Sequence, residues 1–259
     1  MLSIGDTHNI ALACPNVKKL TLYFEELDPG PIFNQLEGLS ALVALRLLSG
    51  PYEMSPKPWR SSCIESITSL TRLTSLYCVA MLLALEDVLP HIQALHSLSS
   101  LDLMLAPAPL PANKDIDQQC SALLHLSHLT SLVLGGFDVS NADIAQLAQA
   151  TQLVSLDLND VHEIIIATEV PRPLTSGDIE LLAAMPKLTY LKVRAMAPDI
   201  DCSGLPCSWT RLTLSDRHDA LQLKKLPLRG VVKLVVGTMK EPQYLQLDEV
   251  DLVDLGESP

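Results

Sequence analysis

A short leucine motif that recurs along nearly the whole chain is the feature that most constrains its fold. The motif has the form L-x-x-L-x-L and is complete in four copies, at residues 42–47, 98–103, 129–134 and 153–158. Further copies begin at residues 17, 73, 188, 209 and 231, and a last candidate spans residues 247–252. Nine or ten copies of one pattern in 259 residues predict a chain built from stacked repeats of a single structural unit.

The spacing inside the motif predicts one strand per repeat. Its last two apolar residues are two apart, which is the period of a strand with one buried face. The chain must then cross over and return before it forms the next strand, so the strands are expected to be parallel. Helical periodicity is present in several returning segments, at residues 62–70, 86–95, 140–150 and 176–185.

The clearest of these helices is predicted at residues 140–150. It opens with cap-forming residues, beginning at Ser140, and it places Ile144, Leu147 and Ala148 on one stripe. Residues 176–185 repeat this design. Strands alternating with such helices indicate an α/β fold with the helices packed outside a parallel sheet.

The repeats resemble those of the leucine-rich-repeat superfamily, in particular the ribonuclease-inhibitor-like and F-box-associated types. The resemblance covers about residues 17–252. It implies a curved horseshoe solenoid, with the parallel β-sheet on the concave side and helices and irregular segments on the convex side. Such repeats often carry Asn or Cys three residues after the last strand leucine, but here those positions hold Glu25, Gly50, Met81, Ala106, Phe137, Val161 and Met196. The backbone N–H and C=O groups of the turns must therefore find other hydrogen-bond partners.

The spacing of the repeats predicts one domain over residues 1–259, with an acidic C-terminal end at 240–259. The first four steps between central strand leucines are 25, 31, 25 and 31 residues, so long and short units alternate. The extra residues fall at 50–60, 106–112 and 159–175, and all three segments are expected on one rim. They are either binding loops or Pro-rich padding without a role. The chain begins almost inside a repeat, so it is also compatible with one part of a longer protein.

The composition favours a cytoplasmic, non-enzymatic protein. Hydrophobic residues make up 48% of the chain but aromatic residues only 4%, which suits a repetitive aliphatic core better than an enzyme. No apolar run reaches the roughly 18 residues of a membrane span, and residues 1–15 lack the pattern of a secretory signal. The six cysteines are scattered, as expected for thiols in a reducing compartment.

The residues flanking the buried strand leucines are expected to point to the concave face and to bind a partner protein. The predicted binding residues are Tyr23, Arg46, Leu48, Tyr77, Val79, Asp102, Met104, Asp157, Asn159, Lys192, Arg194 and Arg211. They divide into an apolar and acidic end and a basic end. The alternatives are that terminal segments cover them or that each is tolerated singly. The basic end suits an acidic protein segment, or the chain's own acidic end, better than nucleic acid, because the net charge is −12.

Catalytic, metal and cofactor motifs are incomplete. His162-Glu163 lacks the second histidine of a zinc helix, and His125 and His128 have no acid or cysteine at ligand spacing. Gly135-Gly136 lacks the Lys-Ser/Thr of a phosphate loop. The sequence therefore predicts a protein–protein interaction module with no catalytic residues, cofactor or metal. One alternative is a substrate-recognition fragment of a ubiquitin-ligase adaptor or other multi-domain regulator. Another is a GTPase-activating protein that uses Arg46 or Arg194 as a finger.

Overall fold

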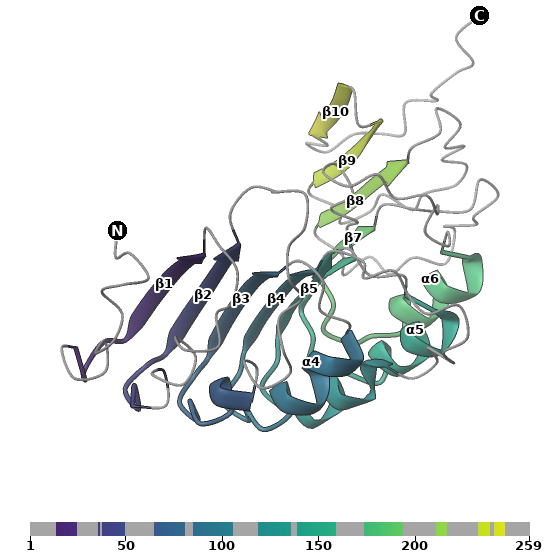
Figure 1. The fold of residues 1–259 in the computed structure, drawn as a ribbon. Coiled ribbons are helices and arrows are strands. Elements are labelled where there is room, and N and C mark those ends of the chain that lie inside the picture. Colours follow the sequence, from purple (N-terminus) through teal and green to yellow (C-terminus); the bar gives the residue numbers. More distant parts are fainter. Residues whose placement is uncertain are drawn as a thin grey trace, which may run out of the picture.

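The repeats form a single sheet in which the strands follow one another in chain order (Figure 1). The computed structural model describes residues 14–24, 36, 38–49, 65–80, 85–105, 119–135, 139–158, 174–193, 211–216, 233–238 and 241–246. The first nine strands are β1 (Lys19–Phe24), β2 (Ala44–Ser49), β3 (Ser75–Ala80), β4 (Ser100–Leu105), β5 (Ser131–Gly135), β6 (Ser155–Leu158), β7 (Tyr190–Val193), β8 (Arg211–Asp216) and β9 (Lys233–Thr238). Each begins two residues into one of the nine predicted motif copies, which confirms those copies.

Strands β1 to β9 pair in parallel, and the motif sets their register. Leu20, Leu45, Leu76, Leu101 and Leu132 lie side by side on the first five strands. The same alignment continues through Leu156, Leu191, Leu212 and Leu234. Equivalent residues of successive repeats therefore form straight columns across the sheet.

The last strand departs from the prediction. β10 (Glu241–Gln246) pairs with β9 in the antiparallel direction, whereas only parallel strands were expected. Just two residues, 239–240, separate β9 from β10. So short a connection closes a hairpin but cannot make the crossover that a parallel strand needs. The predicted tenth copy at 247–252 lies outside the described residues.

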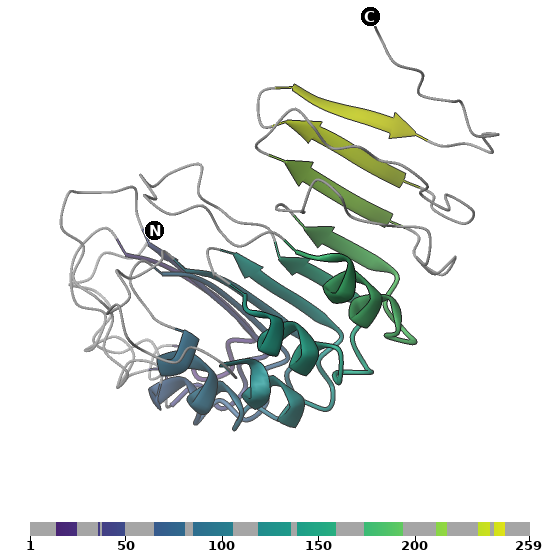
Figure 2. The same ribbon diagram turned by 90° about the vertical axis from the view of Figure 1, so that its right-hand side faces the viewer.

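Helices cover one face of the sheet (Figures 1 and 2). They are α4 (Leu85–Ile92), η2 (Gln119–His125), α5 (Asn141–Leu147) and α6 (Ser176–Ala183), of which η2 is a 3-10 helix. Three of the four predicted helices are thus confirmed, and for the fourth, at 62–70, the structure describes a helical turn at 65–67. η2 was not predicted, because its short segment lacks a capping signal and a clear helical period.

Two of the helices begin with the same reciprocal cap. In α5 the Asp143 amide donates to Ser140 Oγ (3.2 Å) and the Ser140 amide donates to Asp143 Oδ2 (3.1 Å). In α6, Thr175 and Asp178 make the same two hydrogen bonds, so the cap lies one residue before the predicted start at Ser176. Asp143 also accepts from the Cys120 amide of η2 at 3.2 Å. This carboxylate therefore both starts its own helix and joins it to the preceding repeat.

The segment between each helix and the following strand contains backbone hydrogen bonds from an amide to the carbonyl three residues earlier, and it adds regularly spaced apolar positions before the L-x-x-L-x-L motif. Before β4, the Leu95 amide donates to the Ile92 carbonyl (2.8 Å) and the Leu98 amide donates to the Leu95 carbonyl (2.9 Å). The same pair of bonds precedes β2, β3, β5, β6 and β7. The apolar side chains at these three-residue steps are all buried. The repeat therefore has two apolar positions upstream of L-x-x-L-x-L, and their regular spacing is visible in the sequence.

A ladder of hydroxyl groups runs along the start of the strands. Thr74 Oγ1 donates to the carbonyl of Val43 (3.2 Å), and Ser99 Oγ donates to the carbonyl of Thr74 (3.0 Å). Thr130 and Thr189 make the same bond to the residue one repeat earlier. We call these four residues the hydroxyl ladder. They explain the Thr or Ser that follows the first motif leucine, and each adds a hydrogen bond to a carbonyl that also accepts from two backbone amides of the next repeat.

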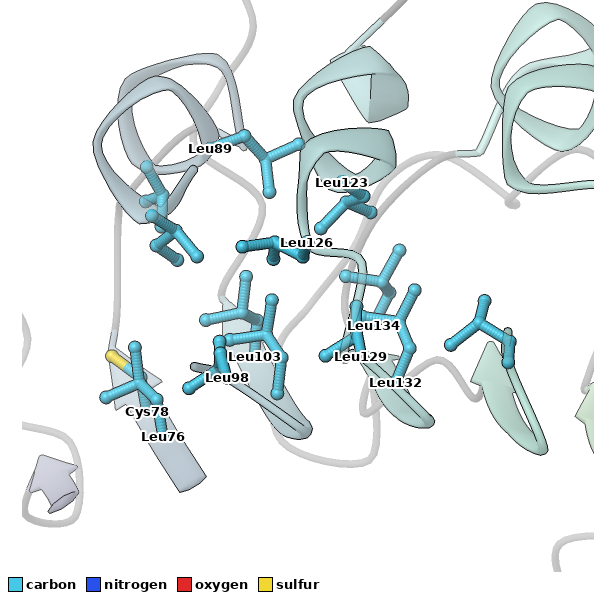
Figure 3. Packing of buried hydrophobic residues seen from close by; sticks show 14 of the residues in the cluster. Leu76, Cys78, Leu89, Leu98, Leu103, Leu123, Leu126, Leu129, Leu132 and Leu134 are labelled. Atoms are coloured by element: carbon cyan, nitrogen blue, oxygen red, sulfur yellow. The ribbon is translucent and has the colours of Figure 1, made fainter. Parts of the chain in front are cut away.

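The core lies between the sheet and the helices and is almost entirely aliphatic (Figure 3). Strand leucines such as Leu103 and Leu132 meet Leu89 of α4 and Leu123 of η2 there. Leu101, Leu132 and Leu156 have no exposed surface. Because burial of one leucine side chain contributes about 1.5–3 kcal/mol, this repeated layer is the main source of stability.

Candidate partner-binding face

The face of the sheet opposite to α4, η2, α5 and α6 carries the columns that were predicted to face a partner. We call it the open face. Alternation along the strands sends Leu45 and Leu47 into the core and leaves Arg46 exposed. The register aligns Arg46 with Tyr77, Asp102, Val133, Asp157 and Lys192 on β2 to β7. We call these six residues the central row.

The structure brings together seven of the twelve predicted binding residues. They are Arg46, Tyr77, Asp102, Asp157 and Lys192 of the central row, with Leu48 and Met104 two residues further along their strands. Tyr23, Val79 and Arg211 lie on β1, β3 and β8, but their side chains are outside the described part of the chain, as are residues 159 and 194 in full. The rim segments 50–60 and 106–112, residues 159–173 of the third rim segment, the seven Asn-ladder positions and the His162-Glu163 pair also lie outside it, whereas Thr175 at the end of the third segment caps α6.

Interactions between strands hold the first half of the central row. The guanidinium carbon of Arg46 lies 4.6 Å from the centroid of the Tyr77 ring, a cation–π contact. The Tyr77 hydroxyl in turn donates to the sulfur of Met104 at 3.6 Å. Three side chains from β2, β3 and β4 thus form one connected surface in which the aromatic ring has a fixed position.

An ion pair holds the other half of the row. Lys192 Nζ lies 3.1 Å from Asp157 Oδ2, and the side chains are 28% and 13% exposed. The sequence placed Asp157 in an acidic end and Lys192 in a separate basic end of the face. The register puts these two residues opposite each other on β6 and β7, so the two ends of the face meet at this ion pair.

Asp102 stands between these two halves. Its side chain is half-buried, and its Oδ1 is buried without a hydrogen-bond partner among the described residues. Burial, reinforced by the negative charge of Asp157, raises the pKa of Asp102 to about 6, while Arg46 and Lys192 act in the opposite direction. The carboxyl group is therefore partly protonated near neutral pH.

The described residues contain no group suited to hold a metal ion, and their buried thiols are unreactive. No three or more His, Cys, Asp or Glu side chains among them cluster in a metal-binding arrangement. Burial and the charge of Asp102 raise the pKa of Cys78 to about 12, and burial and Asp143 raise that of Cys120. A thiol that keeps its proton is a poor nucleophile and a poor metal ligand. His125 and His128 are both exposed.

Comparison with solved structures gives matches of low similarity. An internalin of Listeria monocytogenes is 18% identical with a TM-score of 0.39, and the match covers 75% of this chain and 59% of that one. Internalin C2 of the same organism is 15% identical with a TM-score of 0.40, and the match covers 85% of this chain and 81% of that one. A leucine-rich-repeat protein of Leptospira interrogans is 19% identical with a TM-score of 0.38, and the match covers 83% of this chain and 50% of that one. This chain therefore spans less than two thirds of the first and third of these proteins.

No protein-family model and no curated protein matches the chain. The architecture rests instead on the structure itself, with one strand per leucine motif, zero register shift between repeats and an aliphatic core. It is a leucine-rich-repeat solenoid. Among the described residues, no helix has the length and apolar character needed to cross a membrane.

Proposed function

We propose that the chain is a protein–protein interaction module without catalytic activity, and that its partner binds across the open face. The observation that carries this proposal is the central row. Its six residues follow one another on adjacent strands, and at roughly 4.8 Å per strand they extend over about 24 Å. Arginine and tyrosine side chains held in place, as Arg46 and Tyr77 are, form the typical anchors of protein interfaces.

The organisation of the row supports a binding role. A side chain that is already restrained loses little conformational entropy when a partner covers it. The Arg46–Tyr77–Met104 contacts and the Asp157–Lys192 pair restrain five of the predicted binding residues in this way. The half-buried apolar side chains of Leu48, Met104 and Val133 add surface that a partner would remove from water.

Site-specific photo-crosslinking tests the proposal. A photoreactive phenylalanine at position 77 replaces one aromatic ring by another on the open face. The matched control carries the same group at position 181 on α6, where the leucine side chain is 41% exposed. We expect position 77 to capture a protein that position 181 does not, and the captured protein to bind the purified chain with a measurable Kd. Equal capture at the two positions, or none at position 77, would contradict the proposal.

Two broader predictions remain proposals of the same kind. We propose that residues 1–259 form one domain, because β1 to β10 belong to one sheet. We also propose a cytoplasmic location, which the free thiols of Cys14, Cys78 and Cys120 support. The role as a fragment of a ubiquitin-ligase adaptor is a hypothesis about a longer protein, and no observation on the described residues favours it.

A further inference from the structure

We propose that the open face recognises a protein segment that presents a cationic side chain, an arginine or a lysine, to the carboxylate of Asp102. The inference rests on the proposed function and specifies the chemistry of the partner.

Asp102 is the one carboxylate of the central row without a counter-charge in contact. Among the described residues, Arg46 is engaged with the ring of Tyr77, and Lys192 is paired with Asp157. The buried Oδ1 of Asp102 has no hydrogen-bond partner, although the side chain as a whole is partly exposed. Oδ1 itself is closed to solvent, so a donor that arrives from solvent would meet the accessible part of the carboxylate, whose charge no cation among the described residues contacts. A charge-assisted hydrogen bond in such a place is stronger than one on a fully hydrated surface.

The surroundings of Asp102 suit a long cationic side chain. Tyr77 lies beside it on β3 and Val133 beside it on β5, as the register shows. Met104 is two residues further along β4 and contacts the Tyr77 hydroxyl. Arginine and lysine pack their methylene stems on apolar surface while the charged group reaches a polar partner. A bare metal ion fits less well, because the described residues supply no cluster of three ligands.

The proposal predicts a dependence on pH. The charged and titratable groups around Asp102 are Arg46 and Tyr77 on β2 and β3, Asp157 and Lys192 on β6 and β7, and Cys78 on the core side of β3. Because the pKa of Asp102 is about 6 in the unbound protein, part of the population is protonated below neutrality. A cationic partner favours the ionised form, so binding should weaken as the pH falls, approaching about tenfold per pH unit well below pH 6.

Carboxyl-carbon NMR on the full chain tests the inference with three blocked peptides, Ac-Gly-Arg-Gly-NH2, Ac-Gly-Lys-Gly-NH2 and the neutral Ac-Gly-Gln-Gly-NH2. We expect the arginine and lysine peptides, but not the glutamine peptide, to lower the pH at which Asp102 titrates. Asp102→Asn should abolish the amide shifts that the cationic peptides cause on β4, and Asp102→Glu should restore part of them. Glu180→Gln, which removes an exposed carboxylate of α6, should leave them unchanged.

The outcomes separate this inference from the proposed function. Peptide-induced shifts that persist in Asp102→Asn, that are the same for the glutamine peptide, or that are absent with all three peptides would overturn the inference. For a protein captured at position 77, we expect Asp102→Asn to weaken binding by about 10- to 100-fold. A captured protein whose Kd is unaffected by Asp102→Asn would overturn the inference while leaving the proposed function intact. Thermal melting of each variant shows that it is folded.

Discussion

At the scale of single residues, Asp102 is where stability and binding place different demands on the chain. A half-buried carboxyl group loses hydration, and Oδ1 regains no hydrogen bond within the described residues. Stability alone would favour a neutral side chain of the same shape at this position. The neighbouring cations Arg46 and Lys192 reduce the cost of the charge without making contact with it. A residue that costs stability in the free protein is a reasonable place for a binding contact.

Asp102→Asn should therefore stabilise the protein at high pH. The native group keeps its proton up to about pH 6, whereas in the unfolded chain the same group loses it near 3.8. Stability linked to the protonated group is thus fully present below pH 3.8 and is lost as the pH rises through 6. With allowance for solvent screening, we expect the free energy of unfolding of Asp102→Asn to exceed that of the wild type by about 1–2 kcal/mol at pH 8.

Urea denaturation at a series of pH values measures this difference. The two proteins should have nearly equal free energies of unfolding at pH 4 and should diverge between pH 4 and 7. Glu180→Gln, which removes an exposed carboxylate of α6, is the control. A stabilisation by Asp102→Asn of equal size at pH 4 and pH 8 would show that the effect does not come from the ionised group.

At the scale of elements, the hydroxyl ladder connects each repeat to the one before it. Among the described repeats, the ladder position carries a hydroxyl at Thr74, Ser99, Thr130 and Thr189, a valine at positions 43 and 154 and a lysine at position 18. Val154 is 38% exposed, so its methyl groups gain little from burial. The two valines show that the backbone accepts either residue. The hydroxyl is therefore an added hydrogen bond between repeats and is not a requirement for forming the strand.

Exchange of the two residue types in both directions tests the ladder. Thr74→Val removes the bond to the Val43 carbonyl and should lower the free energy of unfolding by about 0.5–1.5 kcal/mol. Val154→Thr places a hydroxyl next to the Thr130 carbonyl, which already accepts from the Val154 and Ser155 amides, and should raise it by about 0.5 kcal/mol. Urea denaturation measures both variants. A free energy of unfolding that is lower in Val154→Thr than in the wild type would indicate that the ladder hydrogen bond is not the stabilising feature.

The elements also show the limits of reasoning from periodicity. The helices α5 and α6 were predictable because a cap and an apolar stripe occur together in the sequence. η2 has neither signal, and it forms where the connection between β4 and β5 must cover Leu123 and Leu126. Its helical turns are therefore set by the packing of the neighbouring repeats, in which α4 and α5 lie on either side (Figure 1).

At the scale of the whole molecule, the chain is a one-dimensional stack in which each strand of β1 to β9 pairs only with its neighbours in sequence. A central strand pairs with a neighbour on both sides, whereas β1, at the edge of the described sheet, pairs with β2 alone. The difference is visible in the core. Leu132 in the middle has no exposed surface, while Leu20, its equivalent on β1, is only half-buried.

The same substitution should therefore cost more in the middle of the stack than at its start. We expect Leu132→Ala to lower the free energy of unfolding by about 2–5 kcal/mol, because it removes buried methyl groups and leaves a cavity. Leu20→Ala should cost less than half as much, since part of that side chain already contacts water. Urea denaturation of the two variants is the measurement. Equal losses at the two positions would contradict a stack whose ends are less well covered than its centre.

The leucine motif is sufficient to predict the strands of this protein and the columns of its open face. Its apolar spacing is repeated nine times, and a shift of any strand by one residue would expose that strand's leucines, so the motif copies align across the sheet. The residues along each column follow from this alignment. What their side chains contact depends on the tertiary structure. Contact between Arg46 and Tyr77, pairing of Lys192 with Asp157 and isolation of Asp102 depend on rotamers and burial, which a linear pattern does not encode.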